Sequence, residues 1–520
     1  MNASLVAQTW TGATNANWGT STNWSPATVP NSVGAAAVFN DPAANRTVSS
    51  NGTFAVGSIT FNNNTAFTTL LNNSGSGRSI TFDEVGAGPA AITVNGTGNA
   101  VTTISATMIW TDSVTITVND TAVTGASGAL TLTGSSLTGG GGLTKEGNGV
   151  LTSSSNAKSF TGATLVDAGR LRFTASGVFT NTSSVSVTSG AQVMLEQTGT
   201  QSFTLGTSSA TIVTLNGAGL PSGGPYAATS SGALRLGPTV NAATDLTTLT
   251  NAISLASTST VDTGGNATLT LSGGVSGNGG LTKTGTGTLA LTNTGSYGGA
   301  TVVSAGTLNA GAANALGGTS GVTVNSGGTL LLSNSGTTDR INNAASVNLS
   351  SGGVTARTGG ILNTGGLSEG TAPTGAGGAG GVVGALTLTT NTNSGVDFNA
   401  PGNTGNTGGS KLVFQNFSLV SGTAITIDHW TGTANTNGSD QLLFATNPGY
   451  NLADLANVQF TSDAGTNFAL GAQLINFNGY SELVPVPEPS TWAAGILTVL
   501  ALGWTQRRRL TRASALASQS

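Results

Sequence analysis

The chain has 520 residues, of which 79 are glycine and only 7 % are charged, and its formal net charge is −4. Soluble domains average about 25 % charged residues and about 7 % glycine, so the composition argues against a helical enzyme laced with ion pairs. The absence of cysteine excludes disulfides, thiolate metal sites and cysteine nucleophiles. Because 37 % of the residues are hydrophobic, we expect a folded chain rather than a disordered one, built mostly from strands.

The charge is unevenly distributed along the chain. Residues 1–490 contain all 19 acidic residues and 11 of the 15 basic ones, a net charge of −8. Nucleic-acid binding requires a basic face, so this balance argues against a nucleic-acid partner. The remaining basic residues lie close to the C-terminus: Arg507, Arg508, Arg509 and Arg512.

Residues 1–7 are similar to the cleavage end of a signal peptide, because small residues dominate the run Ser4-Leu-Val-Ala7. We expect the mature chain to begin near Gln8 and residues 8–127 to form an N-terminal cap and the opening coils. This segment contains three tryptophans, Trp10, Trp18 and Trp24. Their rings either plug the first coil or present flat faces to a glycan, and we favour the plug.

The middle of the chain contains an internal repeat. Residues 142–152 read Gly-Leu-Thr-Lys-Glu-Gly-Asn-Gly-Val-Leu-Thr, and 138 positions later residues 280–290 read Gly-Leu-Thr-Lys-Thr-Gly-Thr-Gly-Thr-Leu-Ala. A second block, starting at Gly162 and Gly299, recurs with an offset of 137. The clear copies span residues 142–171 and 280–308.

A finer period of about 20 residues runs through residues 128–390. Glycines spaced 19 to 22 positions apart begin short runs with an apolar residue at every second position, which is typical of half-buried strands. Such a period predicts one solenoid coil per repeat, with glycine at the corners. A β-sandwich is the alternative, but it has no reason to repeat at this interval.

The motif Gly-Leu-Thr-Lys-x-Gly-x-Gly-x-Leu at residues 142–151 and 280–289 resembles the autotransporter-associated β-strand repeat. That resemblance implies a right-handed parallel β-helix in the passenger region of a surface protein. We therefore predict an all-β fold, a right-handed parallel β-helix with a short C-terminal hydrophobic helix. Residues 391–483 are expected to form a C-terminal β cap.

The residues that could support chemistry are few. His429 is the only histidine, and no Gly-x-Ser-x-Gly elbow accompanies it, so a structural role is favoured over a Ser-His-Asp triad. Glu146 and Asp167 are one coil apart, but the second copy has Thr284 and Ser304 at these positions. The copies therefore share no acid pair of the kind that a glycosidase needs.

The lysines of the two copies, Lys145 and Lys283, are expected to be solvated charges in turns. We expect no catalytic residue, no metal site and no cofactor. A polysaccharide lyase or glycoside hydrolase on a β-helix scaffold remains the alternative function.

Residues 484–512 combine a proline-rich spacer, an apolar stretch and a basic stop, and residues 513–520 form a tail. A helix from Thr491 to Thr505 would rise about 22 Å, which is shorter than the ~30 Å hydrocarbon core of a membrane. The residues expected to contact the membrane are Trp492, Ile496, Leu497, Val499, Leu500, Leu502 and Trp504. The basic stop comprises Arg507, Arg508 and Arg509.

This segment resembles a PEP-CTERM sorting signal, through Val486, Pro487, Glu488, Pro489 and Ser490 followed by the apolar stretch and the arginines. The resemblance implies export from a Gram-negative bacterium, recognition by an exosortase at the inner membrane and processing near the Pro-Glu-Pro residues. The expected function is that of an exported surface or matrix protein, adhesive or structural, non-catalytic and associated with exopolysaccharide.

Overall fold

In the part of the chain that it describes, the computed structural model contains strands, turns and the short 3₁₀ helix η1 (Ser21–Asn23), and Trp504 and Arg507 are helical. It describes residues 6–65, 67–97, 101–119, 129–134, 136–154, 158–176, 179–220, 231–237, 239–333, 339–350, 360–365, 367–370, 386–388, 394–398, 409–419, 425–431, 439–451, 453–461, 467–486, 504 and 507. The chain divides into two compact units, Met1–Ala345 and Ser346–Ser520. This division lies within the predicted solenoid segment 128–390 rather than at its end.

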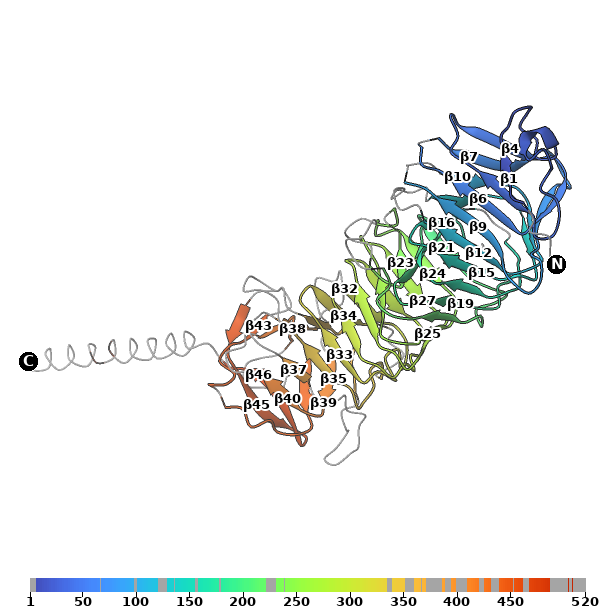
Figure 1. The fold of residues 1–520 in the computed structure, drawn as a ribbon. Helices are drawn as coiled ribbons and strands as arrows, with labels where there is room; N and C mark the ends of the chain where they lie inside the picture. Colours follow the sequence, from blue (N-terminus) through green and yellow to red (C-terminus); the bar gives the residue numbers. More distant parts are fainter. Residues whose placement is uncertain are drawn as a thin grey trace, which may run out of the picture. The chain divides into compact units, whose positions relative to one another are not determined.

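The first unit is a parallel β-solenoid whose strands stack into four sheets (Figure 1). Sheet 1 contains, in spatial order, β2 (Trp24–Ser25), β1 (Gln8–Trp10), β3 (Ala36–Phe39), β6 (Ser58–Asn62), β9 (Ala90–Asn95), β12 (Val114–Val118), β15 (Leu143–Glu146), β17 (Thr164–Val166), β19 (Val185–Val187), β22 (Val213–Leu215), β25 (Ile253–Leu255) and β28 (Val275–Gly277). The strands of sheet 2 in this unit are β4 (Arg46–Ser50), β7 (Thr69–Asn73), β10 (Thr102–Ile104), β13 (Leu130–Leu132), β16 (Val150–Ser153), β18 (Gly169–Phe173), β20 (Ala191–Leu195), β23 (Leu234–Leu236), β26 (Ser259–Asp262), β29 (Leu281–Thr284), β31 (Thr301–Val303) and β33 (Gly321–Val324).

The remaining two sheets cover different stretches of the chain. Sheet 3 comprises β5 (Thr53–Val56), β8 (Ser79–Phe82), β11 (Met108–Trp110) and β14 (Leu137–Gly139). Sheet 4 in this unit comprises β21 (Thr200–Phe203), β24 (Leu246–Leu249), β27 (Thr268–Leu271), β30 (Thr288–Leu291), β32 (Gly306–Ala310) and β34 (Gly328–Leu332). Each full coil therefore visits sheet 1, sheet 2 and then sheet 3 or sheet 4.

Alternating apolar residues create this architecture, because every second side chain of a strand points into the coil. In β12 the inward residues Val114, Ile116 and Val118 are fully buried, whereas the intervening threonines are partly exposed. Aromatic rings continue the same interior stack, with 4.9 Å between the ring centroids of Trp110 and Phe160. The apolar core therefore runs along the axis of the solenoid.

The coils differ in length. Thr164 pairs with Leu143 and with Val185, each 21 positions away. Val213, in contrast, pairs with Ile253, 40 positions later. The predicted period of about 20 residues thus holds for the coils of the repeats, and insertions at the corners lengthen others.

The second unit contains three groups of paired strands. The first is β35 (Ser346–Leu349), β37 (Leu386–Leu388) and β40 (Phe417–Leu419), and the second is β36 (Ile361–Asn363), β38 (Ser394–Asp397), β41 (Ile425–Asp428), β43 (Val458–Thr461) and β44 (Asn467–Leu470). The third is β39 (Lys411–Phe414), β42 (Gln441–Phe444), β46 (Tyr480–Pro485) and β45 (Ala472–Phe477). Antiparallel pairing joins β45 to β46, β42 to β46 and β43 to β44. In the first unit it joins β1 to β2.

The predicted all-β parallel solenoid is confirmed. The predicted C-terminal hydrophobic helix lies almost entirely outside the described residues. Among the residues that the structure describes, no helix has the length and apolar character needed to cross a membrane.

Candidate functional site

Lys145, in the first copy of the repeat, points into the turn between β15 and β16. Its Nζ donates to the backbone carbonyl oxygens of Glu146 at 2.7 Å, Gly147 at 2.8 Å and Ala168 at 3.1 Å. The side chain is fully buried. Because Ala168 belongs to the next coil, one ammonium group joins the corners of two coils.

Lys283, in the second copy, makes the same contacts. Its Nζ donates to the carbonyl oxygens of Thr284 at 2.8 Å, Gly285 at 2.8 Å and Ala305 at 3.1 Å. This side chain is also fully buried. We call each arrangement of lysine and three carbonyl oxygens a lysine turn.

Glycine is required where the following coil stacks against each lysine turn. Gly169 has φ +66°, and a Cβ there would lie 2.5 Å from the carbonyl oxygen of Gly147. Gly306 has φ +65°, and a Cβ there would lie 2.5 Å from the carbonyl oxygen of Gly285. A side chain at either position would be strained by its backbone conformation and would clash with the coil below.

Burial lowers the pKa of both lysines to about 7, because the charged ammonium loses its hydration. Glu146 partly opposes this effect on Lys145, and Asp262 partly opposes it on Lys283. The expectation that both lysines are solvated turn charges is therefore wrong. The strand alternation predicts the burial instead. Lys145 and Lys283 follow Leu143 and Leu281 by two positions, so they lie on the same inward face.

A threonine pair recurs next to each lysine turn. The hydroxyls of Thr164 and Thr182 are 3.0 Å apart, and those of Thr301 and Thr319 are 2.9 Å apart. Thr182 and Thr319 are related by the same offset of 137 as Gly162 and Gly299. Extending that offset along the sequence would have identified them, but sequence analysis missed both.

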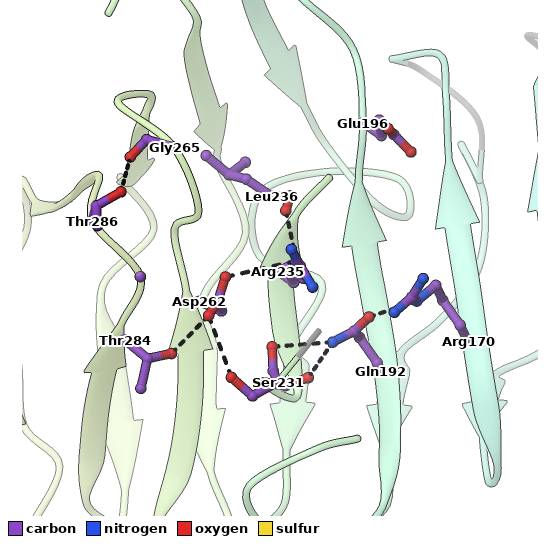
Figure 2. A network of polar contacts seen from close by, with 12 residues as sticks. Arg170, Gln192, Glu196, Ser231, Arg235, Leu236, Asp262, Gly265, Thr284 and Thr286 are labelled. Carbon is purple, nitrogen blue, oxygen red and sulfur yellow. Dashed lines mark hydrogen bonds and ion pairs between the residues drawn. The ribbon is translucent and has the colours of Figure 1, made fainter. Parts of the chain in front are cut away.

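A ladder of polar side chains crosses sheet 2 from β18 to β29 (Figure 2). Arg170 Nε donates to Gln192 Oε1 at 2.6 Å, and Gln192 Nε2 donates to the carbonyl oxygen of Gly232 at 2.8 Å. Asp262 Oδ2 accepts hydrogen bonds from Ser231 Oγ at 3.3 Å and from Thr284 Oγ1 at 3.0 Å. The polar ladder therefore links the last strand of one copy to the first strand of the other.

Three further buried charged side chains lie along this part of sheet 2, those of Arg172, Glu196 and Arg235. Arg172 pairs with Glu196, and Glu196 also accepts a hydrogen bond from Thr239 Oγ1 at 2.8 Å. Arg235 Nε lies 3.6 Å from Asp262 Oδ1. Burial lowers the pKa of Arg235, and Asp262 and Glu196 partly offset this effect. A cavity of about 320 Å³ borders Arg235 and Asp262.

The three N-terminal tryptophans pack together. Trp18 is completely buried and Trp24 is 2 % exposed, and their ring centroids are 4.9 Å apart. Trp18 Nε1 donates to the carbonyl oxygen of Pro30, and Trp24 Nε1 donates to that of Trp18. The favoured interpretation, a plug of the first coil, fits Trp18 and Trp24. The alternative of a glycan contact does not fit them, because both rings are buried. Trp10 is also mostly buried, but it lines a cavity.

His429 follows β41 and has a φ of +53°. Its Nδ1 lies 2.9 Å from Asp397 Oδ1, and Asp397 Oδ2 accepts a hydrogen bond from Asn363 Nδ2 at 3.1 Å. Asp428 Oδ1 accepts a hydrogen bond from Thr461 Oγ1. These contacts give His429 a structural partner in the second unit.

Most of the predicted sorting and anchor residues lie outside the described residues: Pro487, Glu488, Pro489, Ser490, Trp492, Ile496, Leu497, Val499, Leu500, Leu502, Arg508 and Arg509. Val486 follows β46 and is partly exposed. Trp504 and Arg507 are exposed.

The fold and these contacts define a class, a parallel β-solenoid whose repeated coils are held by buried lysine turns. The family model described as the passenger-associated-transport repeat matches residues 143–173 and 281–310. The chain thus carries two copies of this repeat, which indicates a surface or autotransporter-associated β-repeat protein. No curated protein and no solved structure matches the chain.

Proposed function

We propose that the protein is an exported, non-catalytic β-solenoid of the bacterial cell surface or extracellular matrix. Its role is adhesive or structural, and it associates with exopolysaccharide. The observation that carries the proposal is the pair of passenger-associated-transport repeats within one solenoid. Their buried polar side chains hold successive coils together, as expected of a scaffold.

Three acidic groups of the solenoid have structural partners, which supports a non-catalytic role. Glu196 and Asp262 hold the arginines, serine and threonines described above. The Asp245 carboxylate accepts hydrogen bonds from the backbone N–H groups of Gly199, Asn241 and Ala242. These bonds, chiefly that from Gly199, lower the pKa of Asp245. Carboxylates with such structural partners are poorly placed to act as the acid and base of a glycosidase.

The route to the surface rests on the sorting-like segment. In this proposal an exosortase recognises Val486 to Ser490 at the inner membrane of a Gram-negative cell. The apolar stretch holds the chain there transiently, and the arginines stay on the cytoplasmic side.

The catalytic alternative is tested directly. The full-length protein is incubated with neutral and acidic bacterial exopolysaccharides, and chain length is followed by size-exclusion chromatography. The proposal predicts unchanged polymer length and co-sedimentation with at least one polymer. Depolymerisation would instead establish a lyase or hydrolase.

A further inference from the structure

A cavity of about 460 Å³ lies beside the first coils of the first unit, lined by residues 10–12, 15–16 and 40–47. Its volume falls in the range of small-molecule sites, roughly 300–1,000 Å³. Its lining is rich in hydrogen-bonding groups, including three side-chain amides, Asn15, Asn40 and Asn45, and one guanidinium, Arg46.

The indole N–H of Trp10 is open to this cavity. The N–H groups of Trp18 and Trp24 both donate to backbone carbonyls, whereas Trp10 Nε1 has no acceptor among the described residues. Gly12 has φ +64°, and a Cβ there would lie 3.0 Å from Trp10 Nε1. Glycine at this position therefore leaves the space in front of the donor free for a ligand oxygen.

A ladder of asparagines ends at the same cavity. Asn119 Nδ2 donates to Asn95 Oδ1 at 2.9 Å, Asn95 Nδ2 to Asn62 Oδ1 at 3.1 Å, and Asn62 Nδ2 to Asn40 Oδ1 at 3.0 Å. Asn40 is the last member, and its own Nδ2 has no acceptor in the described part of the chain. A ligand oxygen in the cavity would continue the series.

Arg46 supplies a further donor. Its Nε donates to Thr69 Oγ1 at 3.0 Å, and its guanidinium carbon lies 5.4 Å from the centroid of the Phe39 ring. Its Nη2 is buried and has no hydrogen-bond partner within the described residues. Because Nη2 has almost no exposed surface, a ligand oxygen would reach it only after the guanidinium turned toward the cavity. That contact would recover the free energy that an unsatisfied buried donor costs.

The charges around the cavity favour an uncharged ligand. Arg46 is balanced by Asp41, whose carboxylate accepts hydrogen bonds from the backbone and side chain of Asn64. Residues 1–490 carry a net charge of −8, which repels a polyanion at long range. An excess of donors without net charge matches the hydroxyl and ring oxygens of a neutral sugar.

We propose that this cavity binds one sugar unit of a neutral polysaccharide through Trp10 Nε1, Asn40 Nδ2 and the Arg46 guanidinium. The inference rests on the proposed function only in naming exopolysaccharide as the natural source of that unit.

The test measures binding of cellotetraose, maltotetraose and mannotetraose to the full-length protein by isothermal titration calorimetry, with trigalacturonate as an acidic comparison. The variants are Asn40→Ala and Trp10→Phe, which each remove one donor. Asn119→Ala is the matched control, because it shortens the same asparagine ladder at the end remote from the cavity. Thermal melting verifies that each variant folds, and the exposed Asn40 carries the test if Trp10→Phe does not fold.

We expect at least one neutral probe to bind. Loss of a single hydrogen bond should weaken that binding about five-fold in N40A and in W10F, and N119A should bind like the parent. Absence of binding by all neutral probes, tighter binding of trigalacturonate, or equal loss in N40A and N119A would overturn the inference. Each of these outcomes leaves the export route untouched, since the site of C-terminal processing is measured separately.

Discussion

A lysine ammonium has three hydrogens, and each lysine turn offers three carbonyl oxygens to it. The three distances at Lys145 and at Lys283 agree to within 0.1 Å. A side chain of this kind replaces the lost hydration of a buried charge and satisfies carbonyl oxygens at a corner where no strand partner exists. The lysine of the repeat is therefore a structural group that joins coils.

Removal of the ammonium should loosen the coils that each lysine joins. Lys145→Met and Lys283→Met keep the apolar stem but leave three partly buried carbonyl oxygens without their lysine donor, which should destabilise the local coils by about 2 kcal/mol. Hydrogen exchange followed by mass spectrometry should show faster exchange in residues 143–173 for K145M and in residues 281–310 for K283M. Each variant is the control for the other, and uniform acceleration along the whole chain would contradict a local clamp.

The stability of the folded chain should depend on pH through the two lysines. In the folded protein burial lowers the pKa of both lysines to about 7, so each loses a proton near pH 7. In the unfolded chain each keeps the ordinary lysine pKa of 10.5. Between these values the unfolded chain binds more protons, so the free energy of unfolding should rise with pH from 7 to 9, by up to about 1.4 kcal/mol per pH unit and lysine. Below pH 7 this contribution is constant.

Guanidinium unfolding at a series of pH values measures this dependence. Burial also lowers the pKa of Lys158 to about 8, so part of the rise persists without the two lysine turns. The double variant K145M/K283M should nevertheless have a smaller slope than the parent. Equal slopes would show that these lysines do not titrate as inferred.

Within each repeat, the turn that follows the lysine strand stacks on the turn of the next coil. Gly169→Ala and Gly306→Ala place a Cβ against the carbonyl oxygens of the coil below and impose a positive φ on alanine. We expect each to lower the melting temperature by several degrees, corresponding to more than about 1 kcal/mol. Gly298→Ala is the control, because its Cβ would meet no atom within 4 Å, and it should melt like the parent. A parent-like melting temperature for G169A and G306A would contradict the role of these corners.

The strands and corners could be predicted from sequence, because leucine at alternate positions and glycine at a period of about 20 residues are local signals. The inward orientation of Lys145 could also have been derived from its two-residue spacing to Leu143, but its charge favoured the wrong interpretation. The polar ladder could not be predicted. Gln192, Ser231 and Asp262 come from coils of different lengths, so no constant spacing in the sequence relates them.

At the scale of the whole solenoid, the two copies of the repeat use different sheets. Leu143 and Lys145 lie on β15 in sheet 1, whereas Leu281 and Lys283 lie on β29 in sheet 2. Five successive pairings in sheet 1 lead from β15 to β28, so these two strands are five coils apart. The next strand along the chain, β29, belongs to sheet 2. Insertions such as that between Val213 and Ile253 change coil lengths, so an equal sequence offset does not return to the same face.

Because the second copy begins in sheet 2, the polar ladder can connect the two copies within that sheet. The first copy ends on β18 and the second begins on β29, and both strands belong to sheet 2 with β20, β23 and β26 between them. The series of contacts that begins at Arg170 and ends at Thr284 therefore crosses the intervening coils along one face. A chain of buried contacts between two repeats is a property of a scaffold, which is the role that we propose for the molecule.

Export followed by C-terminal sorting can be measured by mass spectrometry of the protein from its native bacterium. Intact mass and C-terminal peptides are measured separately for the cell-surface and extracellular fraction and for the cytoplasmic fraction. We predict that the protein outside the cell ends near Glu488, and that a Glu488→Ala variant accumulates with its C-terminal segment uncut. A chain that stays in the cytoplasm and retains every residue to Ser520 would contradict the account.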